Sequence, residues 1–214
     1  GLVILASLGE RFPKKLTKAN LSAQAKTVRR LVSGKSNEQL LRMRDMVDPA
    51  KLASMRVLGL MFLNTLLVRP VLMPFVSYKM MKLTLVHGLS ILSPTAFACY
   101  GLVCGTGLRD VEMAVRFGEL ALVLLDRFET REYLPRVYAA WYGTVYTLKY
   151  NVAKSLDCLL RAHRVGLLTG DIEFAALNAN LFCFNAYGSG SIRLDVIERQ
   201  WTGFRELAAS LRQS

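Results

Sequence analysis

Hydrophobic residues recur along this 214-residue chain at intervals of three and four positions, the spacing of one helical face. The clearest case follows Asp110, where Val111, Ala114, Ala121 and Leu125 belong to a broad apolar stripe. No stretch alternates between apolar and polar residues over a length that predicts a strand. The pattern therefore predicts an all-α protein.

Capping and turn residues divide this pattern into separate helices. Asp48 suits the N-cap of a helix that begins at Pro49 and ends before Arg69 and Pro70. The short loops between the helices predict antiparallel neighbours that stack as hairpins. Asp110, Asn151 and Asp171 are further N-cap candidates, and Gly170 is expected to end a helix. The later helices are predicted over residues 71–88, 94–106, 111–128, 133–150, 151–170, 172–188 and 194–211.

A small residue recurs in the first helix of each predicted hairpin, which suggests a repeat. The four positions are spaced by 42, 42 and 36 residues. The pattern resembles the tetratricopeptide repeat, whose first helix carries a closely packed Gly or Ala, and predicts a degenerate α-solenoid. The alternative is a non-repetitive helical bundle, because small residues are common where helices cross. The proposed repeat-packing residues are Gly59, Gly101, Gly143 and Ala179.

The composition favours a folded cytoplasmic protein. Hydrophobic residues make up 52% of the chain and charged residues 21%, which excludes an intrinsically disordered class. The four cysteines lie in apolar helical stretches, as expected for reduced, buried thiols rather than a disulfide framework. The chain begins at Gly1 with an apolar run that ends in charge, so we expect a fragment of a longer protein.

One uncharged segment, Leu89–Leu108, is long enough to cross a bilayer. It contains Pro94 and several serines, threonines and glycines, so its hydrophobicity is modest. Pro94 also suits the first turn of a helix that begins near Ser93. We therefore expect a buried helix here, and a small integral membrane protein is the alternative.

The sequence Gly34-Lys35-Ser36 matches the end of a phosphate-binding P-loop. The first glycine of that motif is replaced by Arg29, and the preceding residues have helical rather than strand spacing. A turn between two helices, with Gly34 ending the first, explains the sequence better. We expect no nucleotide or other cofactor to bind.

Residue types that support catalysis or metal binding are sparse. The only histidines are His87 and His163, and Asp157 and Cys158 lie six and five residues before His163, so neither shares its helical face. Cys99 and Cys104 lack a second pair of ligands for zinc. We therefore predict no catalytic residue, cofactor site or metal site, and the alternative is an enzyme whose site is not recognisable.

The segment Arg11–Lys35 carries eight basic residues and no acidic residue. Its charge accounts for much of the formal net charge of +12. We expect this segment to form a solvated helix face or to meet an acidic protein surface. Weak contact with an anionic membrane is the alternative. Phe12 is the only aromatic residue among these basic residues, and so sparse an aromatic content disfavours binding to nucleic acid.

Several stretches resemble the helical-repeat region of large multidomain signalling ATPases of the AAA or STAND type. They include "SGKSNEQLLRM", "DPAKLASMRVLGLMF", "RFGELALVLLDRF" and "GLLTGDIEFAALNANLFCF". The resemblance covers nearly the whole chain and implies a tetratricopeptide-like scaffold. It also implies that ATPase, kinase or sensor activity belongs to domains outside this chain. Arg42 and Arg44 depart from the family pattern, which has a Leu-Pro type turn there.

These observations predict N-terminal helices and a basic connection over residues 1–47, and a helical-repeat domain over residues 48–214. The expected function is non-catalytic protein interaction in signal transduction, within one long chain or between chains. The repeat register places a mostly neutral set of side chains on the inner face. The proposed interaction residues are Arg56, Asn64, Thr95, Thr106, Thr144, Thr147, Glu173 and Asn180.

Overall fold

The computed structural model describes residues 1–13 and 15–210, and their named elements are all helices. The all-α prediction is therefore confirmed. In the described part, pairing of the β type is limited to one isolated bridge between Asp45 and Leu89. The elements are α1 (Leu2–Ser7), α2 (Lys18–Val32), α3 (Asn37–Leu41), α4 (Pro49–Val68), α5 (Met73–His87), α6 (Ser93–Thr106), α7 (Val111–Arg127), η1 (Arg131–Tyr133), α8 (Leu134–Ala140), η2 (Trp141–Val145), η3 (Tyr146–Leu148), η4 (Val152–Ser155), α9 (Leu156–Thr169), α10 (Ile172–Ser189) and α11 (Leu194–Ser210).

Most of the predicted helix boundaries are confirmed by their caps. The Asp48 carboxylate accepts hydrogen bonds from the backbone N–H groups of Ala50 and Lys51. Asp110 accepts from the backbone of Met113, 3.1 Å away, and Gly170 ends α9 in the left-handed conformation. Residue 211, the predicted end of the last helix, lies outside the described residues.

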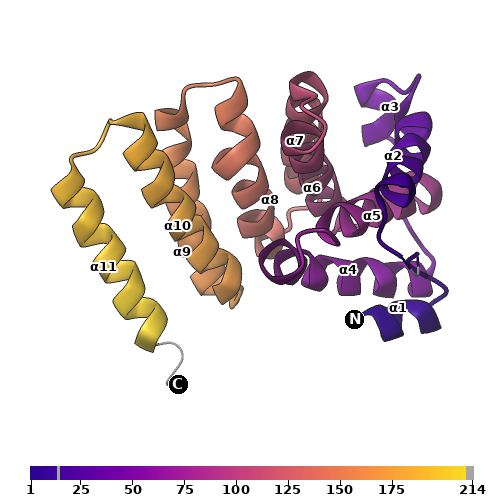
Figure 1. The fold of residues 1–214 in the computed structure, drawn as a ribbon, viewed down its shortest axis with the longest axis horizontal. Helices are drawn as coiled ribbons and strands as arrows, with labels where there is room; N and C mark the ends of the chain where they lie inside the picture. Colours follow the sequence, from indigo (N-terminus) through magenta and orange to yellow (C-terminus); the bar gives the residue numbers. More distant parts are fainter. Residues whose placement is uncertain (14, 211–214) are drawn as a thin grey trace.

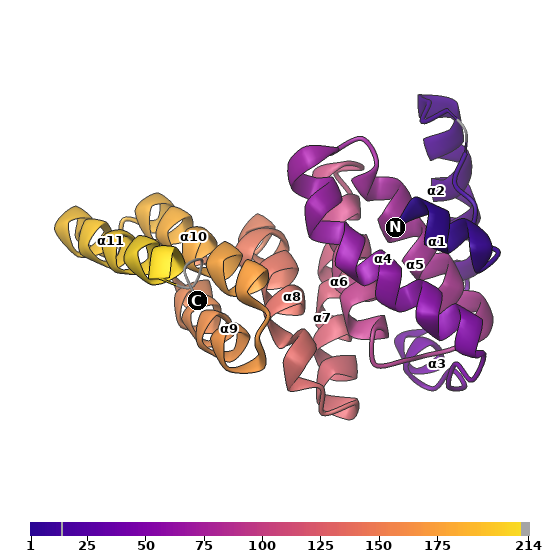
Figure 2. The same ribbon diagram turned by 90° about the horizontal axis from the view of Figure 1, so that it is seen from below.

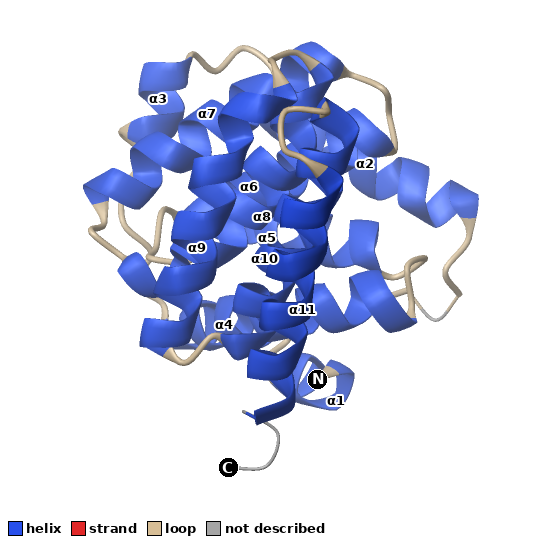
Figure 3. Ribbon diagram, turned by 90° about the vertical axis from the view of Figure 1, so that its left-hand side faces the viewer, coloured by secondary structure: helices blue, strands red, loops and turns tan. Residues whose placement is uncertain are grey.

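Helices that follow one another in the chain lie side by side from α6 to α11 (Figure 1). The first helices, α1 to α5, gather at the other end of the molecule, where α1 packs on α4 and α2 packs on α5 (Figure 2). A view from the α11 end shows helices joined by loops (Figure 3). The main hydrophobic core extends from Leu5 in α1 to Ala162 in α9.

Helix α6 lies at the centre of this core. Every residue of α6 except Thr106 is buried, and the helix packs against α5, α7 and α8. The uncharged segment Leu89–Leu108 thus contains a core helix in this structure. By length and composition, α4 is the one helix among the described residues that could span a membrane. Its most apolar stretch of 18 residues has a mean hydropathy of 1.4, and 39% of that stretch is buried.

The helix predicted over residues 133–150 is interrupted. Helix α8 ends at Ala140 and is followed by the π-helical turn η2 and the 3₁₀ turn η3. The indole of Trp141 packs directly over Gly118, so the wide π-turn begins where a bulky ring meets a neighbouring backbone. Along this segment Tyr138, Tyr142, Tyr146 and Tyr150 follow one another with ring centroids 4.8, 5.4 and 4.8 Å apart.

Two ion pairs join the N-terminal segment to α4 and α5. Glu10, which is 8% exposed, accepts hydrogen bonds from Lys51 of α4 at 2.7 Å and Lys79 of α5 at 3.1 Å. Burial alone raises the pKa of Glu10, but the two lysines outweigh it and the pKa is lowered. The carboxylate is therefore ionised at neutral pH and links three segments of the chain.

Candidate functional site

The structure disperses the eight predicted interaction residues. Asn64 and Glu173 line one pocket, Asn180 lines a second and Arg56 lines a third. Thr95 is 1% exposed and belongs to the core of α6, so its expected place on an interaction surface is wrong. The remaining three are partly or fully exposed, on α6 or on the segment after α8: Thr106, Thr144 and Thr147.

The four repeat-packing residues are all buried, but their surroundings differ. A Cβ atom at Gly101 would lie 2.8 Å from the backbone oxygen of Ala114. At Gly143 it would lie 2.5 Å from the side chain of Leu181, which can move. At Gly59 the nearest atom would be 3.5 Å away, an ordinary contact, and Ala179 is 3% exposed. The closest approach to neighbouring backbone is therefore at Gly101.

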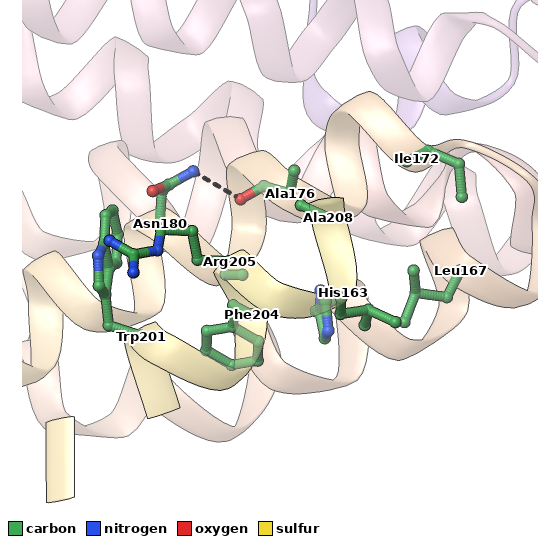
Figure 4. Close-up of a pocket in the computed structure, with 11 residues that line it drawn as sticks. His163, Leu167, Ile172, Ala176, Asn180, Trp201, Phe204, Arg205 and Ala208 are labelled. Atoms are coloured by element: carbon green, nitrogen blue, oxygen red, sulfur yellow. Dashed lines mark hydrogen bonds between the residues drawn. The ribbon is translucent and has the colours of Figure 1, made fainter. Parts of the chain in front are cut away.

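A pocket of about 220 Å³ lies among α9, α10 and α11 (Figure 4). Most of its lining is apolar, and it includes Ala179 and Asn180, which the repeat register singles out. The Asn180 amide donates to the backbone oxygen of Ala176 at 2.9 Å. The lining residues are His163, Leu167, Ile172, Ala176, Ala179, Asn180, Trp201, Phe204, Arg205, Leu207 and Ala208.

His163 is the most buried polar side chain of this pocket, with 8% of its surface exposed. Its Nδ1 lies 2.9 Å from the backbone oxygen of Ala175, and a carbonyl can only accept, so Nδ1 carries a proton. The ring packs edge-on against Phe204, with centroids 4.8 Å apart. In the neutral ring Nε2 is then an acceptor, and the hydrogen bonds of the described residues leave it without a partner.

The opposite part of the pocket carries a positive charge. Arg205 lies beside Trp201 and Asn180 in the close-up (Figure 4). Among the described residues Arg205 has no ion-pair partner, and none of the lining residues is acidic. Sequence reasoning missed Trp201, Phe204 and Arg205, because the pocket forms only when α11 packs against α10.

A second, more polar pocket of about 470 Å³ surrounds Arg136 and Asp171. Arg136 donates from Nε to Asp171 at 2.8 Å, and its guanidinium lies over the ring of Phe174, 5.1 Å from the centroid. Asp171 occupies the predicted N-cap position of α10, but its carboxylate makes no hydrogen bond to the helix backbone, so the predicted side-chain cap is wrong. The long-range partner, 35 residues away, replaces the local one.

The cysteine thiols are poorly suited to nucleophilic chemistry. Burial raises the pKa of Cys99 far above its ordinary value, and burial raises the pKa of Cys104 to about 12. These thiols therefore stay protonated at neutral pH. Among the described residues, no group of His, Cys, Asp or Glu side chains is arranged to hold a metal ion.

The Gly34-Lys35-Ser36 segment forms a turn between two helices, as predicted. Gly34 has φ +78° and follows the end of α2, and Ser36 caps α3 through a reciprocal hydrogen bond with Gln39. Arg116 of α7 donates to the Lys35 backbone oxygen at 2.6 Å. This part of the described chain has helices on both sides of the turn, in place of the strand that precedes a P-loop.

The basic segment forms a charged outer face on α2. Val28 and Val32 are buried, while Lys18, Lys26 and Arg30 are exposed. Arg29 pairs with Asp110 at 3.4 Å, at a largely exposed position where such a pair contributes little. Lys14 belongs to the predicted basic segment but lies outside the described residues.

The chain was compared with known protein families, sequences and structures. No family model, curated protein sequence or solved structure matches the chain.

Proposed function

We propose that the chain is a non-catalytic helical-repeat scaffold for protein interaction, built as a degenerate tetratricopeptide-like α-solenoid. The observation that carries this proposal is the order of packing. From the second proposed hairpin onward, each first helix contacts the next one, since α6 packs on α8 and α8 packs on α10, while α7, α9 and α11 pack beside them. Stacking of consecutive hairpins is the arrangement by which repeat proteins bury a continuous core.

Exposed apolar side chains on α4 and α10 accompany this stacking. Leu63 and Leu66 of α4 share a hydrophobic cluster with Leu177 and Leu181 of α10, so the two helices border one another. Both helices also expose large apolar side chains, which soluble proteins usually keep few and scattered. These exposed residues are Leu60, Leu67 and Val68 on α4, and Phe184 and Tyr187 on α10.

The proposed context is a cytoplasmic, multidomain signalling ATPase or kinase protein, in which other domains supply the chemistry. The resemblance of the repeat stretches supports this context. A mostly apolar and neutral surface suits contact with another domain of the same chain or of a partner protein, and suits a highly acidic peptide less well. The scaffold would then position the effector domain.

Binding to the ATPase and effector domains of the proposed longer protein, prepared as separate chains, tests this function. Leu60→Arg with Phe184→Arg should weaken binding about tenfold or more, because each change places a charge in the apolar surface. Lys15→Glu with Lys18→Glu is the matched control and should change binding little. The reverse ranking would move the interaction surface to the basic segment, and no binding by the unaltered chain would refute the scaffold function.

The apolar character of α4 supports a second candidate, contact with a membrane. Leu60 is 63% exposed and Val68 is 75% exposed on a helix that is long enough to span a bilayer. Co-sedimentation with anionic and neutral lipid vesicles separates the candidates. The scaffold proposal predicts a chain that stays in solution without detergent. Binding to neutral vesicles that Leu60→Arg abolishes would favour the membrane.

A further inference from the structure

The pocket among α9, α10 and α11 has the attributes of a small-molecule site. It combines a mostly apolar lining with three polar side chains, which is the usual make-up of pockets that orient a ligand. Its volume of about 220 Å³ suits a small ligand rather than a large cofactor. Trp201 and Leu207 remain 43% and 38% exposed beside it, and a ligand would cover them.

The deep end of the pocket offers a hydrogen-bond acceptor, Nε2 of His163. His163 is more than nine-tenths buried, and its Nδ1 proton is committed to the Ala175 backbone oxygen. This bond fixes the tautomer of the neutral ring and directs the Nε2 lone pair away from that carbonyl. Nε2 is an acceptor in this tautomer, and an N–H or O–H group of a ligand can donate to it.

The other end offers a positive charge on the exposed side chain of Arg205. Arg205 is the one cation among the lining residues, and no carboxylate lies among them to neutralise it. Trp201 and Asn180 flank this guanidinium (Figure 4), which gives a carboxylate an amide neighbour and an aromatic wall. Phe204 lies between Arg205 and His163 in the same view, where it can pack on a flat ring.

We propose that this pocket binds a small aromatic monocarboxylic acid whose ring carries an O–H or N–H group. Arg205 holds the carboxylate, Phe204 and the aliphatic side chains enclose the ring, and Nε2 of His163 accepts the ring proton donor. This ligand contacts the Arg205 cation and the Nε2 acceptor of His163 at once, neither of which has a side-chain partner among the described residues. The proposal goes beyond the scaffold function and does not depend on it, since ligand binding is measured on the isolated chain.

Calorimetric titration with three matched ligands tests the proposal on the unaltered protein. The probes are 4-hydroxyphenylacetate, phenylacetate without the hydroxyl donor, and 4-hydroxyphenylacetamide without the charge. We expect saturable one-to-one binding of 4-hydroxyphenylacetate and about tenfold weaker binding of each of the other two. Absence of saturable heat up to about 10 mM, or equal affinity for all three, would overturn the proposal.

Two variants locate the site. Arg205→Gln should weaken 4-hydroxyphenylacetate binding about tenfold and leave the neutral amide unaffected, because only the charge contact is lost. Arg199→Gln, on the same helix but outside the pocket lining, is the control and should bind like the unaltered chain. Ala208→Phe should fill the pocket and abolish binding while the helical circular dichroism is retained.

Equal binding by Arg205→Gln and the unaltered chain would contradict the assignment of the carboxylate contact. Sedimentation of the ligand-free chain distinguishes a different occupant. A dimer that dissociates in Ala208→Phe would place a second copy in the pocket, and would overturn the small-molecule proposal.

Discussion

Arg136 and Asp171 form an ion pair across 2.8 Å that ties α8 to the residue before α10. Their side chains are only 14% and 12% exposed, so water screens the pair weakly. The guanidinium also lies over the rings of Phe174 and Tyr133, at 5.1 and 5.7 Å from the centroids. The pair thus stabilises the junction of two proposed hairpins rather than the end of one helix.

Asp171→Ser separates these two roles. Serine is as good an N-cap as aspartate, so a capping role would leave stability nearly unchanged. An ion-pairing role predicts that the free energy of unfolding falls by roughly 1–3 kcal/mol, because Arg136 keeps its charge in a largely buried place. Urea denaturation measures the difference.

Asp48→Ser is the matched control, since Asp48 is a cap whose carboxylate accepts from two backbone N–H groups. It should change stability by only a few tenths of a kcal/mol. Equal losses at Asp48 and Asp171 would contradict the ion-pair explanation.

A graded series of glycine substitutions tests the close crossings. Gly101→Ala should lower the free energy of unfolding by about 1–3 kcal/mol, because the new methyl group meets a backbone oxygen. Gly143→Leu should cost a similar amount by overpacking Leu181. Thermal unfolding followed by circular dichroism gives the order of stability.

Gly203→Ala in α11 is the control for helix propensity. Nothing lies within 4 Å of a Cβ atom there, so alanine should gain about 0.5–1 kcal/mol. A raised melting temperature for Gly143→Leu would refute the repeat register, which requires a close crossing at that residue.

Glu10 makes part of the stability depend on pH. Its folded-state pKa is lowered below the ordinary value of 4.5, so its contribution is complete above that pH and is lost as pH falls through the folded pKa. Glu10→Gln should therefore destabilise the chain by roughly 1–3 kcal/mol at pH 7. Denaturant unfolding at a series of pH values should show the two proteins converging at low pH. A difference that stays constant down to pH values well below 4.5 would exclude a role for the charge.

The turn at Gly34 predicts that Mg-ATP does not bind. Lys35 directs its backbone oxygen to Arg116, and the preceding residues are helical, so the backbone N–H groups do not form a phosphate cradle. Calorimetry should show no saturable heat, and Lys35→Ala should behave identically. Micromolar binding that Lys35→Ala abolishes would overturn the prediction.

Local signals predicted the helices well. Asp48, Asp110, Pro94 and Gly170 mark boundaries through contacts with residues at most four positions away, which a single sequence contains. The π-turn at Trp141 was not predictable in this way. Its wide geometry accompanies the packing of the indole on Gly118, which depends on how α7 and the end of α8 meet.

The candidate site was harder to predict for the same reason. Asn180 was chosen from the repeat register, but its neighbours Trp201 and Arg205 come from a helix whose packing the sequence does not specify. Asp171 carries the local signature of a cap, and only the folded chain brings Arg136 to it. Thr95 has a polar side chain in a register position expected on the inner face of the solenoid, yet α6 is buried along nearly its whole length.

The tyrosines along η2 and η3 should make the intrinsic fluorescence of the chain sensitive to the packing of this segment. Tyr146 and Tyr150 lie 5.7 and 6.3 Å from the Trp141 ring, close enough for efficient transfer of excitation energy to the indole. Tyrosine emission from this segment should be quenched in the folded chain and should reappear when the rings separate. Opening of the irregular turn can therefore be followed by intrinsic fluorescence, without a label.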